Sequence, residues 1–103
     1  MKKVVIVDDE APARALVKQY LGEYPELIIV GECNNGVDAL KVISEFKPDL
    51  VFMDVQMPGM NGFETCRQLK ADETTANIPI IFMTALADKT SRVEGLSLGA
   101  VDY

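Results

Sequence analysis

Acidic residues follow directly on two short apolar runs of this 103-residue sequence. Asp8 and Asp9 come after residues 4–7, and Asp54 comes after residues 50–53. Runs of this length with polar boundaries are typical of buried strands, so each strand would end by presenting carboxylates to a loop. In an open parallel sheet the carboxyl ends of neighbouring strands lie together, and ligands bind there. We therefore expect the three carboxylates to share one site.

Three carboxylates in one site repel one another unless a cation lies among them. Oxygen ligands without His or Cys suit a hard ion, and Mg²⁺ binds characteristically through one or two carboxylates, waters and a phosphate. The sequence has no His, and the spacing of Cys33 and Cys66 is not typical of a zinc site. The pattern therefore predicts Mg²⁺ as cofactor. Asp54 would be a nucleophile that forms an acyl phosphate, with the metal offsetting the charge of the phosphoryl oxygens.

A hydroxyl residue, Thr84, follows the apolar run of residues 78–83. At the end of a strand beside Asp54, its hydroxyl could hydrogen-bond a phosphoryl oxygen and so shift the following loop. Simpler interpretations stay open. Asp54 can be a turn residue that ends a strand, and Asp8 with Asp9 can be a solvated pair that caps a helix. Thr84 can be a residue that merely favours β-structure.

Four apolar runs of strand length alternate with four segments of helical periodicity. The predicted strands are residues 4–7, 27–30, 50–53 and 78–83. The apolar faces predicted for the first three helices are Ala15, Leu16, Tyr20 and Leu21, then Val37, Leu40, Ile43 and Phe46, then Phe63, Cys66 and Leu69. A last helix is predicted over about residues 88–98. This alternation predicts an α/β fold with a doubly wound parallel sheet and right-handed crossovers.

Composition is that of an ordinary soluble domain, with 49% hydrophobic and 25% charged residues. The length and the even composition predict a single domain over residues 1–103. The net charge of -6 and the absence of a Lys or Arg run disfavour direct binding of nucleic acid by this segment. The apolar run at the N-terminus is too short for a signal peptide or membrane span, so we expect a cytoplasmic location.

Four pieces of the sequence resemble the receiver domain of bacterial response regulators, the phosphoprotein modules of two-component signal transduction. They are Val-Asp-Asp-Glu after the first strand, Met-Asp-Val-Gln-Met-Pro-Gly-Met-Asn-Gly after the third, Met-Thr-Ala after the fourth and Gly-Ala-Val-Asp-Tyr at the end. Each piece alone is weak, but together at this spacing they are highly specific. The resemblance implies a flavodoxin-like sheet with strand order 2-1-3-4-5.

The resemblance also implies a role for individual residues. Asp54 would be the phosphoacceptor, and Asp8, Asp9 and Asp54 would hold Mg²⁺ together with the backbone carbonyl of Gln56. Thr84 and Tyr103 would be the switch pair, the aromatic ring turning inward when Thr84 engages the phosphoryl group. The implied partners are a sensor histidine kinase or phosphotransfer protein and an output domain or partner protein. Such a protein catalyses only its own phosphorylation and dephosphorylation, so we do not expect an enzyme of metabolism.

The sequence departs from the family pattern at its end. Family members carry a Lys-Pro on the fifth strand, a few residues beyond the position of Tyr103, and that Lys pairs with the phosphate. We therefore expect a receiver domain that is incomplete at the C-terminus, with strand order 2-1-3-4 present and the fifth strand and helix missing. A second chain could pair the open edge of residues 78–83 and form a dimer. The main alternative function is a phosphorylation-incompetent receiver fragment that acts as an interaction or scaffold module.

Overall fold

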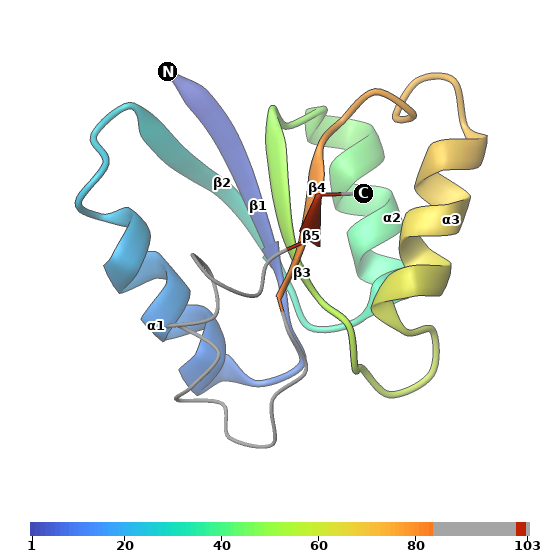
Figure 1. Cartoon of the computed structure of the whole chain (residues 1–103), viewed down its shortest axis with the longest axis horizontal. Helices are drawn as coiled ribbons and strands as arrows, with labels where there is room; N and C mark the ends of the chain where they lie inside the picture. Colours follow the sequence, from blue (N-terminus) through green and yellow to red (C-terminus); the bar gives the residue numbers. More distant parts are fainter. Residues whose placement is uncertain (84–100, 103) are drawn as a thin grey trace.

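The computed structural model describes residues 1–83 and 101–102, in which strands and helices alternate along the chain (Figure 1). Their bounds are β1 Lys2–Val7, α1 Ala11–Leu21, β2 Leu27–Cys33, α2 Gly36–Phe46, β3 Leu50–Asp54, α3 Gly62–Ala71, β4 Ile80–Met83 and β5 Val101–Asp102. The helix predicted over residues 88–98 lies outside the described residues. None of the described helices is both long and apolar enough to cross a membrane.

The sheet has the order β2-β1-β3-β4-β5, and its first four strands run parallel. Helix α1 covers one face of the sheet, and α2 and α3 cover the other (Figure 1). The predicted α/β class, the doubly wound parallel sheet and the order 2-1-3-4 are therefore confirmed. Because β1 and β3 are neighbours at the centre, the residues that follow both strands emerge at the same edge of the sheet.

The edge of β4, which the sequence predicted to be open, is in part paired by this chain itself. Val101 and Asp102 form β5 and run antiparallel to β4, opposite Phe82 and Ile81. A strand edge carries unpaired N–H and C=O groups that accept any extended segment within reach, and this explains the pairing. The direction of β5 distinguishes it from a fifth parallel strand.

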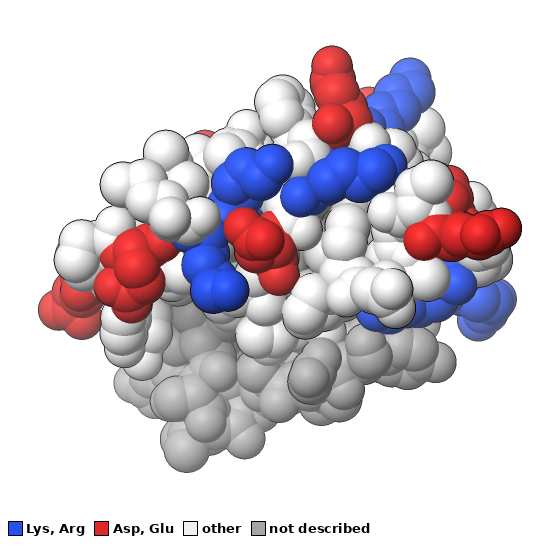
Figure 2. Space-filling model, turned by 90° about the horizontal axis from the view of Figure 1, so that it is seen from above, with Lys and Arg blue, Asp and Glu red and all other residues white. Residues whose placement is uncertain are grey.

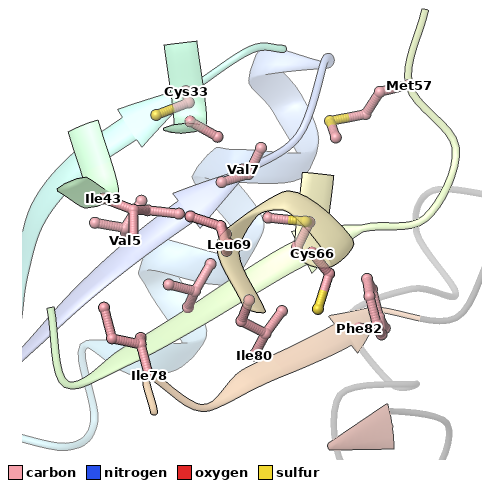
Figure 3. Close-up of a cluster of buried hydrophobic side chains, with 13 residues drawn as sticks. Val5, Val7, Cys33, Ile43, Met57, Cys66, Leu69, Ile78, Ile80 and Phe82 are labelled. Carbon is pink, nitrogen blue, oxygen red and sulfur yellow. The ribbon is translucent and has the colours of Figure 1, made fainter. Parts of the chain in front are cut away.

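Two groups of buried side chains fill the two faces of the sheet. In β1, Val4 and Ile6 face α1, whereas Val5 and Val7 face α2 and α3. Figure 3 shows the cluster under α2 and α3, where side chains from β1, β4 and both helices interdigitate. A strand that is apolar on both sides is typical of the centre of a parallel sheet, as predicted for residues 4–7.

The buried helix faces differ in part from those predicted. In α1 the buried residues are Ala13, Val17 and Leu21, so Leu21 is the one member of the predicted set that is buried. In α2 they are Gly36, Ala39 and Ile43, while Val37 and Phe46 are 52% and 42% exposed. Small residues let a helix approach a sheet closely, and the spacing of the larger apolar residues does not reveal such a contact.

Helix α3 follows its predicted face more closely. Cys66 and Leu69 are buried as predicted, whereas Phe63 is 48% exposed. The ring of Phe63 nevertheless packs on Phe82 of β4, with ring centroids 4.8 Å apart. Phe63 therefore lies at the rim of the core, where one side of the ring makes an apolar contact and the other is open to solvent.

Candidate metal and phosphoryl site

Asp8, Asp9 and Asp54 lie together at the carboxyl ends of β1 and β3. The register pairs Val7 with Met53, so that Asp8 and Asp54 each follow one member of a matched pair. One carboxylate oxygen from each of the three residues lies within 4.8 Å of the others. The side chains of Asp8 and Asp54 are fully buried and that of Asp9 is half-buried. We call these three residues the acidic cluster.

Three hydrogen bonds fix Asp8 at the end of β1. Its N–H donates to the carbonyl oxygen of Cys33 in β2 at 3.0 Å. Its Oδ1 accepts from the N–H of Glu10 at 3.0 Å, which is an Asx turn that leads into α1. Its carbonyl oxygen accepts from Nη1 of Arg14 at 2.8 Å. Both the main chain and the carboxylate of Asp8 are therefore held in place.

Asp54 is the last residue of β3 and is in register with Met83 of β4. Its Oδ1 accepts from the N–H of Gln56 at 3.3 Å, so the loop after β3 begins with a second Asx turn. Gln56 thus lies in the loop directly beside the acidic cluster.

The loop after Asp54 is closed by a glycine that the sequence analysis did not single out. The N–H of Gly62, the first residue of α3, donates to the carbonyl oxygen of Val55 at 2.9 Å. A Cβ at this position would overlap the carbonyl oxygen of Asp54 and lie 3.0 Å from the Cα of Val55. Glycine therefore allows the N-terminus of α3 to pack against the main chain of the expected phosphoacceptor, Asp54.

Two further features shape the same loop. Met57 is buried in the core under α2 and α3 (Figure 3), which ties the loop to the sheet. Gly59 adopts a φ of 74°, a left-handed conformation that favours glycine. The side chain of Asn61 accepts from the N–H of Glu64 at 2.9 Å and caps α3, so a regular helix starts directly after the loop.

Arg14 also contacts the acidic cluster and was missed in the sequence. Its Nε donates to Oε1 of Glu32 at 3.2 Å, while Nζ of Lys18 donates to Oε2 of Glu32 at 2.9 Å. The hydrogen bond from Lys18, together with the charge of Arg14, lowers the pKa of Glu32. The sequence signal for Arg14 is a cation in the first turn of the helix that follows the acidic pair.

The thiols of Cys33 and Cys66 are both free and buried. Burial raises the pKa of Cys33 to about 11, and it raises the pKa of Cys66 as well. Both thiols are therefore largely protonated at neutral pH in the metal-free protein. The donors of the acidic cluster are carboxylate oxygens, which is the set that a hard cation such as Mg²⁺ prefers. The residues present thus fit the expected ion.

Two predicted residues, Thr84 and Tyr103, lie outside the described residues. Thr84 directly follows Met83, the residue in register with Asp54. Their roles in a switch stay predictions.

Comparison with known proteins defines the family. The chain matches the response regulator receiver domain over residues 4–103. It is 41% identical over 102 residues to the response regulator PleD of Caulobacter vibrioides, covering 98% of this chain and 22% of that protein. It is 42% identical over 104 residues to the phosphate regulon transcriptional regulatory protein PhoB of Pseudomonas aeruginosa, covering 99% of this chain and 44% of that protein. The chain therefore belongs to the response regulator receiver domain family.

Solved structures agree with this assignment. The signal receiver domain of a signal transduction histidine kinase from Syntrophus aciditrophicus superposes with a TM-score of 0.76 at 32% identity. The superposition covers 96% of this chain and 72% of that chain. By contrast, the chain spans less than half the length of PleD and PhoB.

Proposed function

We propose that this chain is a phosphoacceptor module, in which Asp54 takes a phosphoryl group from a phosphohistidine of a sensor histidine kinase or phosphotransfer protein. The observation that carries the proposal is the acidic cluster, whose three carboxylates approach within 4.8 Å at the ends of two adjacent strands. In a signalling module of this family, such a cluster would bind Mg²⁺ for phosphoryl transfer.

The transfer is a substitution at phosphorus. A carboxylate oxygen of Asp54 attacks, the P–O bond forms, and the P–N bond of the phosphohistidine breaks. The imidazole leaves with the electron pair of that bond and takes a proton from solvent. The hydrogen bond from the N–H of Gln56 to Oδ1 at 3.3 Å limits rotation of the Asp54 carboxylate before the attack.

The acidic cluster would hold the metal. Asp8, Asp9 and Asp54 and the backbone carbonyl of Gln56 are the proposed ligands of Mg²⁺. When bound, Mg²⁺ supplies positive charge against the phosphoryl oxygens. Burial of Asp8 and Asp54 keeps water away from their carboxylates and strengthens this electrostatic effect.

The signal would leave the site through Thr84 and Tyr103 as the switch pair, acting on an output domain or partner protein. Residues 1–103 would form one receiver domain with a cytoplasmic location, which modifies itself and no external metabolite. Among the described residues on the face seen in Figure 2, basic and acidic side chains are interspersed, so this part of the face offers no extended patch of positive charge to nucleic acid. If the chain forms a dimer, we propose that the two copies pair through the edge of the sheet.

Intact-mass spectrometry tests the proposal. The chain is incubated with a small acyl phosphate donor, with and without Mg²⁺, beside the variants Asp54→Ala and Asp72→Ala. Asp72 is an exposed residue at the end of α3 and serves as a matched loss of one carboxylate. We expect one added phosphoryl group in the native chain and in Asp72→Ala, only with Mg²⁺, and none in Asp54→Ala. Absence of the label in the native chain would favour the scaffold module instead.

A further inference from the structure

The side chain of Arg14 joins the loop of the acidic cluster to β2. Its Nη1 donates to the carbonyl oxygen of Asp8 at 2.8 Å, and its Nε donates to Oε1 of Glu32 at 3.2 Å. A guanidinium has several donors in a fixed planar fork, so one Arg side chain can hold two acceptors at a set separation. Arg14 is only 19% exposed, which limits competition from water.

These contacts close a ring around Asp8. Its N–H donates to the carbonyl oxygen of Cys33, the residue that follows Glu32 in β2. Starting from Asp8, the ring passes through Arg14 to Glu32, along one peptide bond to Cys33, and back to Asp8. Both main-chain polar groups of Asp8 are therefore tied, directly or through Arg14, to the same two residues of β2.

We propose that Arg14 is a positioning residue for Mg²⁺: its fork fixes the main chain at Asp8, and thereby the spacing of the Asp8 and Asp9 carboxylates within the acidic cluster. This inference rests on the proposed function, because it concerns the same site. The carboxylate of Asp8 is itself tied to the following main chain, since Oδ1 accepts from the N–H of Glu10 at 3.0 Å. A shift of the main chain at Asp8 would therefore move the carboxylate as well.

Lys18 is the matched control in this network. Its Nζ binds the other carboxylate oxygen of Glu32 at 2.9 Å, and no hydrogen bond or ion pair described for Lys18 involves Asp8. Lys18→Met removes one ion pair of Glu32 and leaves the bond from Arg14 to the loop. A contribution to general stability is therefore separable from a contribution to the geometry of the site.

The test measures the dissociation constant of Mg²⁺ by isothermal titration calorimetry on the whole chain. We expect Arg14→Met to raise it about tenfold, the scale typical for partners that orient metal ligands. Lys18→Met should leave it unchanged. Arg14→Lys keeps the charge but cannot hold both acceptors at once, so its dissociation constant should fall between those of the native chain and Arg14→Met.

The labelling reaction gives a second readout. In Arg14→Met, the Mg²⁺ concentration that gives half of the maximal labelling rate should rise by the same factor, while the maximal rate at saturating Mg²⁺ changes little. If Arg14→Met fails to fold, as judged by circular dichroism, Glu32→Gln takes its place. It keeps an acceptor oxygen but removes the negative charge that Nε of Arg14 contacts, and it should raise the dissociation constant about threefold, less than removal of Arg14 itself.

The outcomes are distinct. Equal Mg²⁺ affinity in the native chain, Arg14→Met and Glu32→Gln would overturn the inference and leave the proposed function intact. Full affinity in Arg14→Lys would also overturn it, because charge alone would then suffice. A native chain that binds no Mg²⁺ would overturn the proposed function, and the inference with it.

Discussion

Asp8 and Asp54 are charged groups that are fully removed from solvent at a short distance from Asp9. Carboxylates at this separation repel one another, and the repulsion is larger inside a protein than in water. A site of this kind can bind a cation and a phosphoryl group, but it lowers the free energy of unfolding of the metal-free protein. At the scale of single residues, the acidic cluster should therefore be a source of strain in the absence of metal.

The substitution Asp54→Asn tests this strain. It keeps the shape of the side chain and an acceptor for the N–H of Gln56, but it removes one of three negative charges. We expect the free energy of unfolding in EDTA to rise by about 1–2 kcal/mol, because the like-charge repulsion falls. Urea unfolding followed by circular dichroism measures this. A lower free energy of unfolding for Asp54→Asn would contradict the account.

The two thiols give a prediction about reactivity. Because burial raises the pKa of Cys33 to about 11, about one thousandth of this thiol is ionised at pH 8. Burial also raises the pKa of Cys66. We expect alkylation of Cys33 by iodoacetamide at pH 8 to be at least about 100-fold slower in the native protein than in urea, where its thiol has an ordinary pKa. Equal rates would show that the thiols are accessible in the folded state.

At the scale of elements, the site depends on how closely α3 approaches β3. Gly62→Ala places a Cβ against the carbonyl oxygen of Asp54, so we expect a loss of about 2–3 kcal/mol in the free energy of unfolding and slower phosphorylation of Asp54. Gly59→Ala is the control. Because Gly59 has a φ of 74°, this substitution should lower the free energy of unfolding by about 1 kcal/mol, but the added Cβ would meet nothing within 4 Å.

Denaturation with urea and the rate of labelling at saturating Mg²⁺ separate the two variants. Gly59→Ala should be destabilised with an unchanged labelling rate. If Gly62→Ala labels as fast as the native chain, the close contact between α3 and β3 does not position the phosphoacceptor.

Periodicity and loop residues were enough to predict the four parallel strands and the meeting of Asp8 with Asp54. Each of these features depends on a local run of sequence together with the known rules of parallel sheets. Contacts between distant residues were not predictable in this way. Arg14 acts through Glu32, 18 residues away in the sequence, and Gly62 acts through a main-chain contact that depends on how α3 packs.

The helix faces show the same limit. Tyr20 was predicted to lie on the apolar face because of its helical spacing from Leu16, whereas Val17 and Ala13 are the residues that pack on the sheet. The choice between faces depends on the shape of the opposing surface, which one helix sequence does not contain. Likewise, the pairing of β4 with Val101 and Asp102 has no periodic pattern to reveal it, because β5 has only two residues.

At the scale of the whole molecule, metal binding should be coupled to folding. The ligands Asp8 and Asp9 follow β1 and Asp54 ends β3, so the site exists only when the sheet has formed. Mg²⁺ at 100 times its dissociation constant should raise the free energy of unfolding by about 2.7 kcal/mol by mass action. Differential scanning calorimetry with and without Mg²⁺ measures this, and Asp54→Ala should show a smaller increase. The same increase in both proteins would contradict a shared site.

Phosphorylation of Asp54 in a Mg²⁺-dependent step is the reaction that defines the proposed function. The most direct measurement is to treat the chain with an acyl phosphate donor, reduce it with borohydride and sequence its peptides by mass spectrometry. Borohydride converts an aspartyl phosphate to homoserine, which marks the phosphorylated position. We predict homoserine at position 54 alone, and only when Mg²⁺ and the donor are both present. Homoserine at another Asp, or none at position 54 under these conditions, would contradict the account.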